Sequence, residues 1–194
     1  MTAYADLLDL QTAVIERVKN TSIADVFPQL VRLAEASFNR RLRCREQIAT
    51  TTVTITGGSA SLPADFEEVL GVYDGAGNEY INQPVQALQQ VQSRGYYAIA
   101  GSTIRAAADE ALTLQYYAKL PTISGAMSDT NWLLQRHPGL YLYGCIFEAA
   151  KHLADVELAT TVAPILDLEA QAVEAADASS RYARARVRVA GVTP

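Results

Sequence analysis

Apolar residues recur at spacings of three and four near the start of the chain, which predicts two helices. Over residues 4–19 the apolar positions share one helical stripe, and the charged residues lie elsewhere. Asn20, Thr21 and Ser22 interrupt this pattern, and a second stripe runs from Val26 to Leu42. The chain therefore begins with a predicted helical hairpin.

The hydrophobic period changes to two in the middle of the chain, which predicts strands. Gln47–Thr56 alternates Val and Ile with Thr, and Gly57-Gly58 is a tight-turn signal after which Ser59–Leu62 is expected to return as the hairpin partner. Further strands are predicted at Val69–Tyr73, Tyr96–Ala100, Thr103–Ala107 and Leu112–Leu120, the last three as a meander. This pattern is typical of a small antiparallel sheet or barrel.

Helical spacing returns after residues 121–130, which are rich in Ser, Gly, Thr and Asp. Asp129 or Thr130 is expected to cap a short helix over 131–136, and an apolar stripe over 140–154 predicts the next helix. A final helix is expected from about residue 157 to about residue 185, with Pro164 kinking it or marking its start. Its predicted inward side chains are Leu158, Val162, Ile165, Ala172 and Ala176.

These elements predict an α+β fold, in which a helical bundle formed by the N- and C-terminal helices carries an inserted small antiparallel β-sheet or barrel subdomain. The expected boundaries are 1–45 for the N-terminal helical hairpin, 46–125 for the β insert, 126–185 for the C-terminal helices that complete the bundle, and 186–194 for an extended basic tail.

The composition is that of a globular chain. Its 194 residues are 49% hydrophobic and 19% charged, which suits one domain or one domain with an insertion. Two cysteines without a basic-then-apolar leader predict reduced thiols in a cytosol-like compartment. No apolar run approaches the roughly 18 residues of a membrane span, so no membrane is expected.

The formal charge of −5 is distributed unevenly. Residues 46–93 contain acidic residues and no Lys or Arg, whereas arginines gather at the end of the second predicted helix and in the last fourteen residues. Setting the four C-terminal arginines aside leaves about −9 on the rest of the chain. An acidic body with a cationic tail indicates a partner, and the alternative is that terminal arginines only keep a frayed end in solution.

No pattern of catalytic or metal-ligating residues stands out, so we expect no enzyme activity, no cofactor and no metal. His137 and His152 are far apart, and Cys44 and Cys145 are isolated, with Cys145 in an apolar stripe typical of a buried thiol. Glu148 and His152 lie one turn apart and could be a ligand pair, although a surface hydrogen bond or a packed histidine is the commoner arrangement.

The acidic and glycine-rich segments have simpler interpretations than binding sites. Asp65, Glu67 and Glu68 could bind a hard cation, but they lack a calcium-loop pattern, and a solvated acidic face is favoured. Strands rather than helices follow Gly57-Gly58 and Gly75-Ala76-Gly77, which predicts turns instead of phosphate-binding loops.

Several short segments occur in a distinctive order over about residues 4–185. They are Leu33–Ala36, Asn39–Arg43, Val53–Gly58, Leu62–Phe66, Tyr116–Pro121, Thr130–Leu134, Tyr141–Gly144 and Glu148–Ala150. In sequence, order and spacing they resemble the head-to-tail adaptor (connector) proteins of tailed phages with short-tail-type connectors. Pro164 and the residues after Tyr182 depart from that pattern.

The resemblance implies a virion structural protein made in the host cytoplasm. Such a protein forms a ring, commonly of twelve subunits, that docks under the portal protein at the capsid vertex and carries the tail or nozzle proteins. Genomic DNA would pass through the lumen without sequence-specific binding, since acidic walls do not hold phosphate.

Two groups of residues are expected to make these contacts. The tail alternates arginine with Ala and Val in a strand-like period, which favours docking on the portal. The arginines at the helix end are expected to pair with the acidic insert of a neighbouring subunit, and a DNA-facing band is the alternative. The portal-binding set is Arg181, Tyr182, Arg184, Arg186, Val187 and Arg188, and the subunit-interface set is Arg40, Arg41, Arg43, Arg45, Asp65, Glu67 and Glu68.

Two further points stay open at this level. Tyr96, Tyr97, Tyr116, Tyr117 and Tyr141 suit either protein interfaces or ordinary packing. A non-catalytic DNA- or regulator-binding module that uses the basic C-terminal tail is the alternative function, and it predicts a steep salt dependence of DNA binding.

Overall fold

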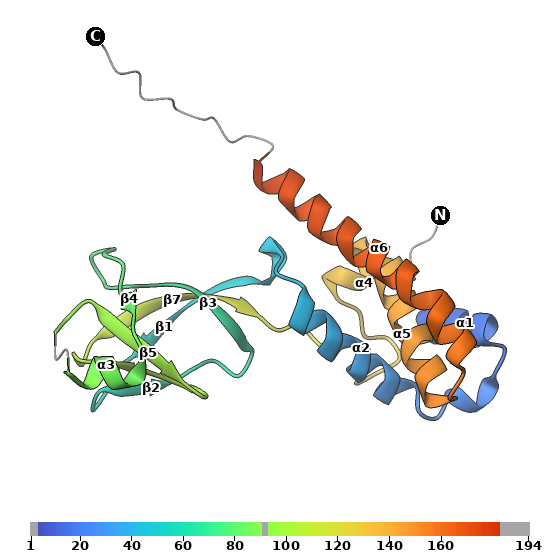
Figure 1. Ribbon diagram of the computed structural model, residues 1–194, viewed down its shortest axis with the longest axis horizontal. Coiled ribbons are helices and arrows are strands. Elements are labelled where there is room, and N and C mark those ends of the chain that lie inside the picture. The colour runs from blue at the N-terminus through green and yellow to red at the C-terminus, as the bar shows by residue number, and fades with distance from the viewer. Residues whose placement is uncertain (1–3, 91–92, 183–194) are drawn as a thin grey trace, which may run out of the picture. The chain divides into compact units, whose positions relative to one another are not determined.

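The computed structural model describes residues 4–90 and 93–182, which fold into two compact units (Figure 1). Among the described residues, the helical unit combines residues 4–44 with residues 121–182, and the β unit lies within residues 45–120. Helices from both ends of the chain flank a sheet region, and the fold class is α+β, as predicted.

Helix α5 is the centre of the helical unit, because α1, α2, α4 and α6 all pack against it. It is buried along most of its length, whereas the helices around it each keep a solvent face. The described helices of this unit are α1 (Leu7–Val18), α2 (Phe27–Arg41), α4 (Trp132–Arg136), α5 (Pro138–His152) and α6 (Val156–Tyr182).

The helices α2 and α5 approach closely at Gly144. A Cβ atom built on Gly144 would come within 2.5 Å of Phe38 Cζ, so the absence of a side chain at this position lets the two helices approach. The Phe38 ring also packs edge-on against Tyr141, with ring centroids 5.3 Å apart. Gly144 is therefore a packing requirement, although glycine is a weak helix former.

Helix α6 begins at Val156, close to the predicted start, and Pro164 lies inside it, so the alternative that Pro164 marks its start is wrong. Asp155 caps it by accepting a hydrogen bond from the Leu158 amide at 2.9 Å. Pro164 is exposed, and so is Thr160, the residue whose carbonyl loses its amide partner at this proline. The predicted inward positions Ala172 and Ala176 are wrong, because both are exposed. The buried side chains of α6 are Val162, Ala170 and Val173.

Two sheets enclose one hydrophobic core in the β unit. The strand order is β1-β7-β3 in the first sheet and β2-β6-β5-β4 in the second. Core side chains from both sheets, among them Val53, Val72, Ile104 and Leu114, pack together. The elements are β1 (Ile48–Thr54), β2 (Ser59–Ser61), β3 (Phe66–Tyr73), β4 (Ile81–Asn82), α3 (Val85–Gln90), β5 (Tyr96–Ala100), β6 (Thr103–Ala106) and β7 (Ala111–Ala118).

Two predicted strand pairings are wrong. The strand β2 pairs with β6 and meets the β1 side at the single bridge Thr56–Ser59, within the described residues. The strand β7 lies between β1 and β3 and does not continue a meander from β6. The Asp109 carboxylate accepts hydrogen bonds from the amides of Gly58 and Gly57, at 2.9 and 3.0 Å, which lowers the pKa of Asp109 and ties this turn to the residues before β7.

We predict that Gly144→Ala destabilises the protein. Overpacking a filled core costs about 1–3 kcal/mol, and the better helix propensity of Ala offsets about 1 kcal/mol of that. Chemical denaturation measures the net change. In a Phe38→Leu background the contact is absent, so the same Gly144→Ala change should there become neutral or stabilising. Equal costs in both backgrounds would contradict the packing argument.

Candidate functional site

A buried carboxylate holds the segment Pro121–Asn131 against the helical unit. Glu35, on α2, is only 5% exposed. One carboxylate oxygen accepts hydrogen bonds from the Ile123 amide at 2.8 Å and the Tyr141 hydroxyl at 3.1 Å, and the other accepts one from Thr122 Oγ1 at 2.7 Å. Three donors therefore satisfy a charge that would be costly to bury alone.

The network continues from Tyr141 to Asn131. Asn131 Nδ2 donates to the Tyr141 hydroxyl at 2.6 Å and to the Pro121 carbonyl at 2.7 Å. Its Oδ1 accepts from the Leu134 amide at 2.9 Å, so Asn131 is the N-cap of α4, and the prediction that Asp129 or Thr130 caps this helix is wrong. Burial and the nearby Glu35 carboxylate raise the pKa of Tyr141, which stays a neutral donor.

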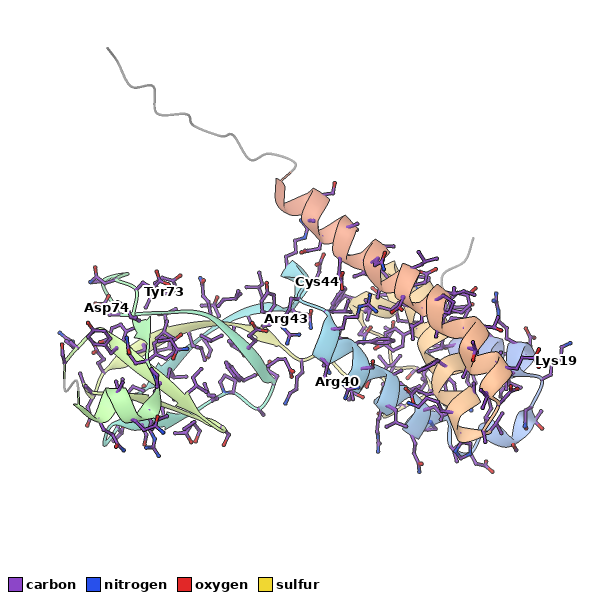
Figure 2. The ribbon with its side chains drawn as sticks, viewed as in Figure 1. Lys19, Arg40, Arg43, Cys44, Tyr73 and Asp74 are labelled. Carbon is purple, nitrogen blue, oxygen red and sulfur yellow. The ribbon has the colours of Figure 1, made fainter. Side chains whose placement is uncertain are left out.

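The arginines predicted for an interface occupy three different environments near the end of α2, where Figure 2 labels Arg40 and Arg43. Arg40 is exposed. Arg41 pairs with Asp167 at 2.6 Å and Glu174 at 3.4 Å, both on α6, and this pairing raises its pKa. Arg41 is therefore engaged within its own chain.

The remaining members of the set lie close to backbone or side-chain partners as well. Arg43 Nη1 donates to the carbonyls of Asn39 and Leu42 at 2.6 and 2.7 Å. Arg45 pairs with Glu46 at 3.3 Å in the β unit. Arg40, Arg41 and Arg43 belong to the helical unit, and Arg45 belongs to the β unit.

The acidic residues predicted for the same interface lie just before β3 and at its start, in the β unit. Asp65 accepts a hydrogen bond from the Tyr116 hydroxyl at 3.0 Å, and its backbone carbonyl accepts one from the Lys119 amide at 2.7 Å. Glu67 is half-buried and Glu68 is exposed. These contacts hold Asp65 in place at one end of the first sheet.

The predicted portal-binding residues are at the edge of the described chain or beyond it. Arg181 and Tyr182 form the end of α6, where the structure describes the backbone. Arg184, Arg186, Val187 and Arg188 lie outside the described residues.

The tyrosines considered for interfaces are packing residues of this chain. Tyr97, Tyr116, Tyr117 and Tyr141 are buried, and Tyr96 is half-buried. Strand alternation places Tyr116 and Tyr117 on opposite faces of β7, and both are buried. Of the two alternatives that the sequence left open, burial within the single chain favours ordinary packing for these four tyrosines.

The cysteines and histidines that the sequence offered as candidate ligands or nucleophiles have structural surroundings. Cys44 and Cys145 are free and buried, and burial raises the pKa of Cys145, as expected for an inert thiol. Glu148 pairs with Lys151, at 3.0 and 2.8 Å, and no contact with His152 accompanies it among the described residues. In the described chain no group of three or more His, Cys, Asp or Glu residues is arranged to hold a metal ion.

A shallow hollow of about 410 Å³ lies in the β unit. Arg105 is the charged residue in its lining. The lining residues are Gly58, Val85, Leu88, Gln89, Arg105, Ala106 and Ala107. No helix in the described residues is long and apolar enough to cross a membrane.

We predict that Tyr141→Phe destabilises the helical unit by about 1–3 kcal/mol, because it leaves buried groups of Glu35 and Asn131 with fewer partners. Tyr143→Phe, on the same helix, is the matched control. Its hydroxyl accepts an exposed hydrogen bond from Arg17, so its loss should change stability by less than about 0.5 kcal/mol. Urea denaturation compares the two, and equal effects would contradict the network's role.

Comparison with known proteins gives one family. The SU10 adaptor protein family model matches residues 5–190, nearly the whole chain. A search of curated protein sequences finds no significant match.

Proposed function

Since the chain belongs to the SU10 adaptor protein family and is a phage head-tail adaptor protein, we propose that it assembles as a ring under the portal and connects the capsid vertex to the tail. The observation that carries this proposal is the family match over residues 5–190. The ring would have about twelve copies, carry the tail or nozzle proteins, and let genomic DNA pass without reading its sequence. The role is structural and non-catalytic.

The structure supports an assembly role in two ways. A closed ring needs two different surfaces on each subunit that meet around a rotation axis. The helical unit exposes large apolar side chains on separate helices, with Leu33 of α2 53% exposed and Leu168 of α6 65% exposed. In addition, every buried side-chain polar atom of the described residues has a hydrogen-bond partner, as expected for a subunit with a single well-defined fold.

Subunit contacts in the proposed ring pair the arginines 40, 41, 43 and 45 of one copy with the acidic residues 65, 67 and 68 of the next. Arg41 already binds Asp167 and Glu174 of its own chain, so its contribution is to position the end of α2 beside α6. Arg40 is exposed at the same helix end, so a substitution there tests the subunit contact without breaking the ion pairs of Arg41.

We predict that Arg40→Glu blocks ring assembly on portal particles without unfolding the subunit. Reversing an exposed charge places like charges opposite one another across each subunit contact, and the ring repeats this cost at every interface. Electron microscopy of mixed particles and circular dichroism of the variant measure assembly and folding. Lys19→Glu makes the same charge change at the end of α1 and should assemble normally. Rings of Arg40→Glu at the wild-type yield would refute the proposed pairing.

The C-terminal residues are proposed to dock on the portal through Arg181, Tyr182, Arg184, Arg186, Val187 and Arg188. The support is the alternation of arginine with Ala and Val, which suits an extended segment lying along a partner's strand or groove. The net charge of this segment is opposite in sign to that of the rest of the chain, which suits a separate contact with a partner protein.

We predict that deleting residues 183–194 lowers attachment to portal particles at least tenfold. The deletion starts after Tyr182, where α6 ends, so the helical unit stays intact. Co-sedimentation with portal particles measures attachment, and replacing Arg184, Arg186 and Arg188 by Gln separates charge from length. Undiminished attachment of the deleted chain would refute portal docking. Salt-sensitive binding of the full chain to free DNA would instead favour a DNA-binding module.

A further inference from the structure

The two sheets of the β unit have four edge strands, and three of them are protected from pairing with another chain. The strands β2 and β4 are three and two residues long. The strand β3 carries two register shifts, and its outer side is covered by the Tyr80 amide, which donates to the Val72 carbonyl at 2.7 Å. Short strands and bulges are common ways in which proteins block edge-to-edge contacts.

The fourth edge strand, β1, has none of these protections. It is seven residues long and pairs with β7 in continuous register from Ile48–Tyr117 to Thr54–Ala111. Its sequence, Ile-Ala-Thr-Thr-Thr-Val-Thr, contains no charge and no proline. Ile48, Thr50, Thr52 and Thr54 are exposed along it.

The outer backbone edge of β1 is unpaired within the part of the chain that the structure describes. The nearest strand on that side, β2, meets it at the bridge Thr56–Ser59, beyond the end of β1, and then leaves to pair with β6. The amides and carbonyls of β1 that point away from β7 therefore form an open template for another strand.

We propose that β1 pairs with β1 of a second copy, antiparallel and about a two-fold axis, in the unassembled protein. Full overlap of seven residues places the axis at Thr51. Ala49 then lies opposite Val53 on the core side, and Thr50 lies opposite Thr52 on the outer side. Cross-strand threonine pairs are favourable, and the neutral strand meets itself without like-charge repulsion.

Other strands of this protein fit the edge less well. The β3 strand of a second copy is bulged and acidic at Glu67 and Glu68. The C-terminal segment would bring Arg184, Arg186 and Arg188 to a strand without a charged side chain to receive them. A second β1 matches in length, charge and side-chain pattern.

This contact is separate from the proposed ring. An isologous contact joins two copies and stops, whereas a ring requires head-to-tail contacts. The pairing covers an edge that would otherwise promote aggregation before the subunit reaches the virion. Its failure would leave the ring proposal unaffected, and failure of the ring would leave the dimer intact.

Analytical ultracentrifugation of the full chain should show a dimer at micromolar concentration. Thr52→Lys should raise the dimer dissociation constant at least tenfold, because the two-fold axis at Thr51 places the two introduced lysines diagonally across the strand pair, where their like charges repel. Gln171→Lys adds the same charge on the exposed face of α6 and should leave the constant unchanged. A wild-type monomer at all concentrations, or equal effects of both lysines, would overturn the proposal.

Cysteine cross-linking tests the register. Thr51→Cys should oxidise to a disulfide-linked dimer because residue 51 faces its own copy across the axis, whereas Thr54→Cys, which lies opposite Ile48, should not. The native thiols at Cys44 and Cys145 are buried and do not compete. Equal cross-linking at 51 and 54 would overturn this pairing. Loss of the dimer on deleting residues 183–194 would also overturn it, because the C-terminal segment, and not a second β1, would then be what pairs with the β1 edge.

Discussion

The buried carboxylate of Glu35 is the interaction on which the helical unit depends. It receives hydrogen bonds from Ile123, Thr122 and Tyr141, and so joins α2, the segment that follows the β unit, and α5 at one point. Because a buried charge is tolerated only when its lone pairs are satisfied, these three parts of the chain must come together for any of them to be stable there. The network thereby fixes the segment that follows the β unit against α2 and α5.

Charge has a different role at the surface of the same unit. Arg41 forms ion pairs with Asp167 and Glu174 of α6. Exposed ion pairs of this kind contribute little stability, typically less than about 1 kcal/mol. Their effect is orientation, because they join the end of α2 to the middle of α6. Arg40, in contrast, is exposed.

Much of the fold could be predicted from periodicity. The stripes of α1, α2 and α5 and the alternation of β1, β5, β6 and β7 follow from local spacing, and the α+β class follows from their order. The pairing of the strands could not be predicted in this way, because it depends on contacts between distant residues. One example is the contact between Asp109 and Gly57-Gly58, which joins residues about fifty positions apart and leaves no local pattern in the sequence. The site was the least predictable part. Its arginines were found as a cluster, but the capture of Arg41 by α6 depends on how two distant helices cross.

The sequence alone determined which segments are helix and which are strand, that Cys145 is a buried thiol, and that the chain resembles phage head-tail adaptors, since these depend on residue type and order. Only the tertiary structure decided that Tyr116, Tyr117 and Tyr141 are core residues, that Glu35 is a buried anchor, and that β1 is an open edge. The physical reason is that burial and strand partnership are properties of what lies across from a residue. The residues next to it in the sequence do not show which residues will lie across from it in the fold.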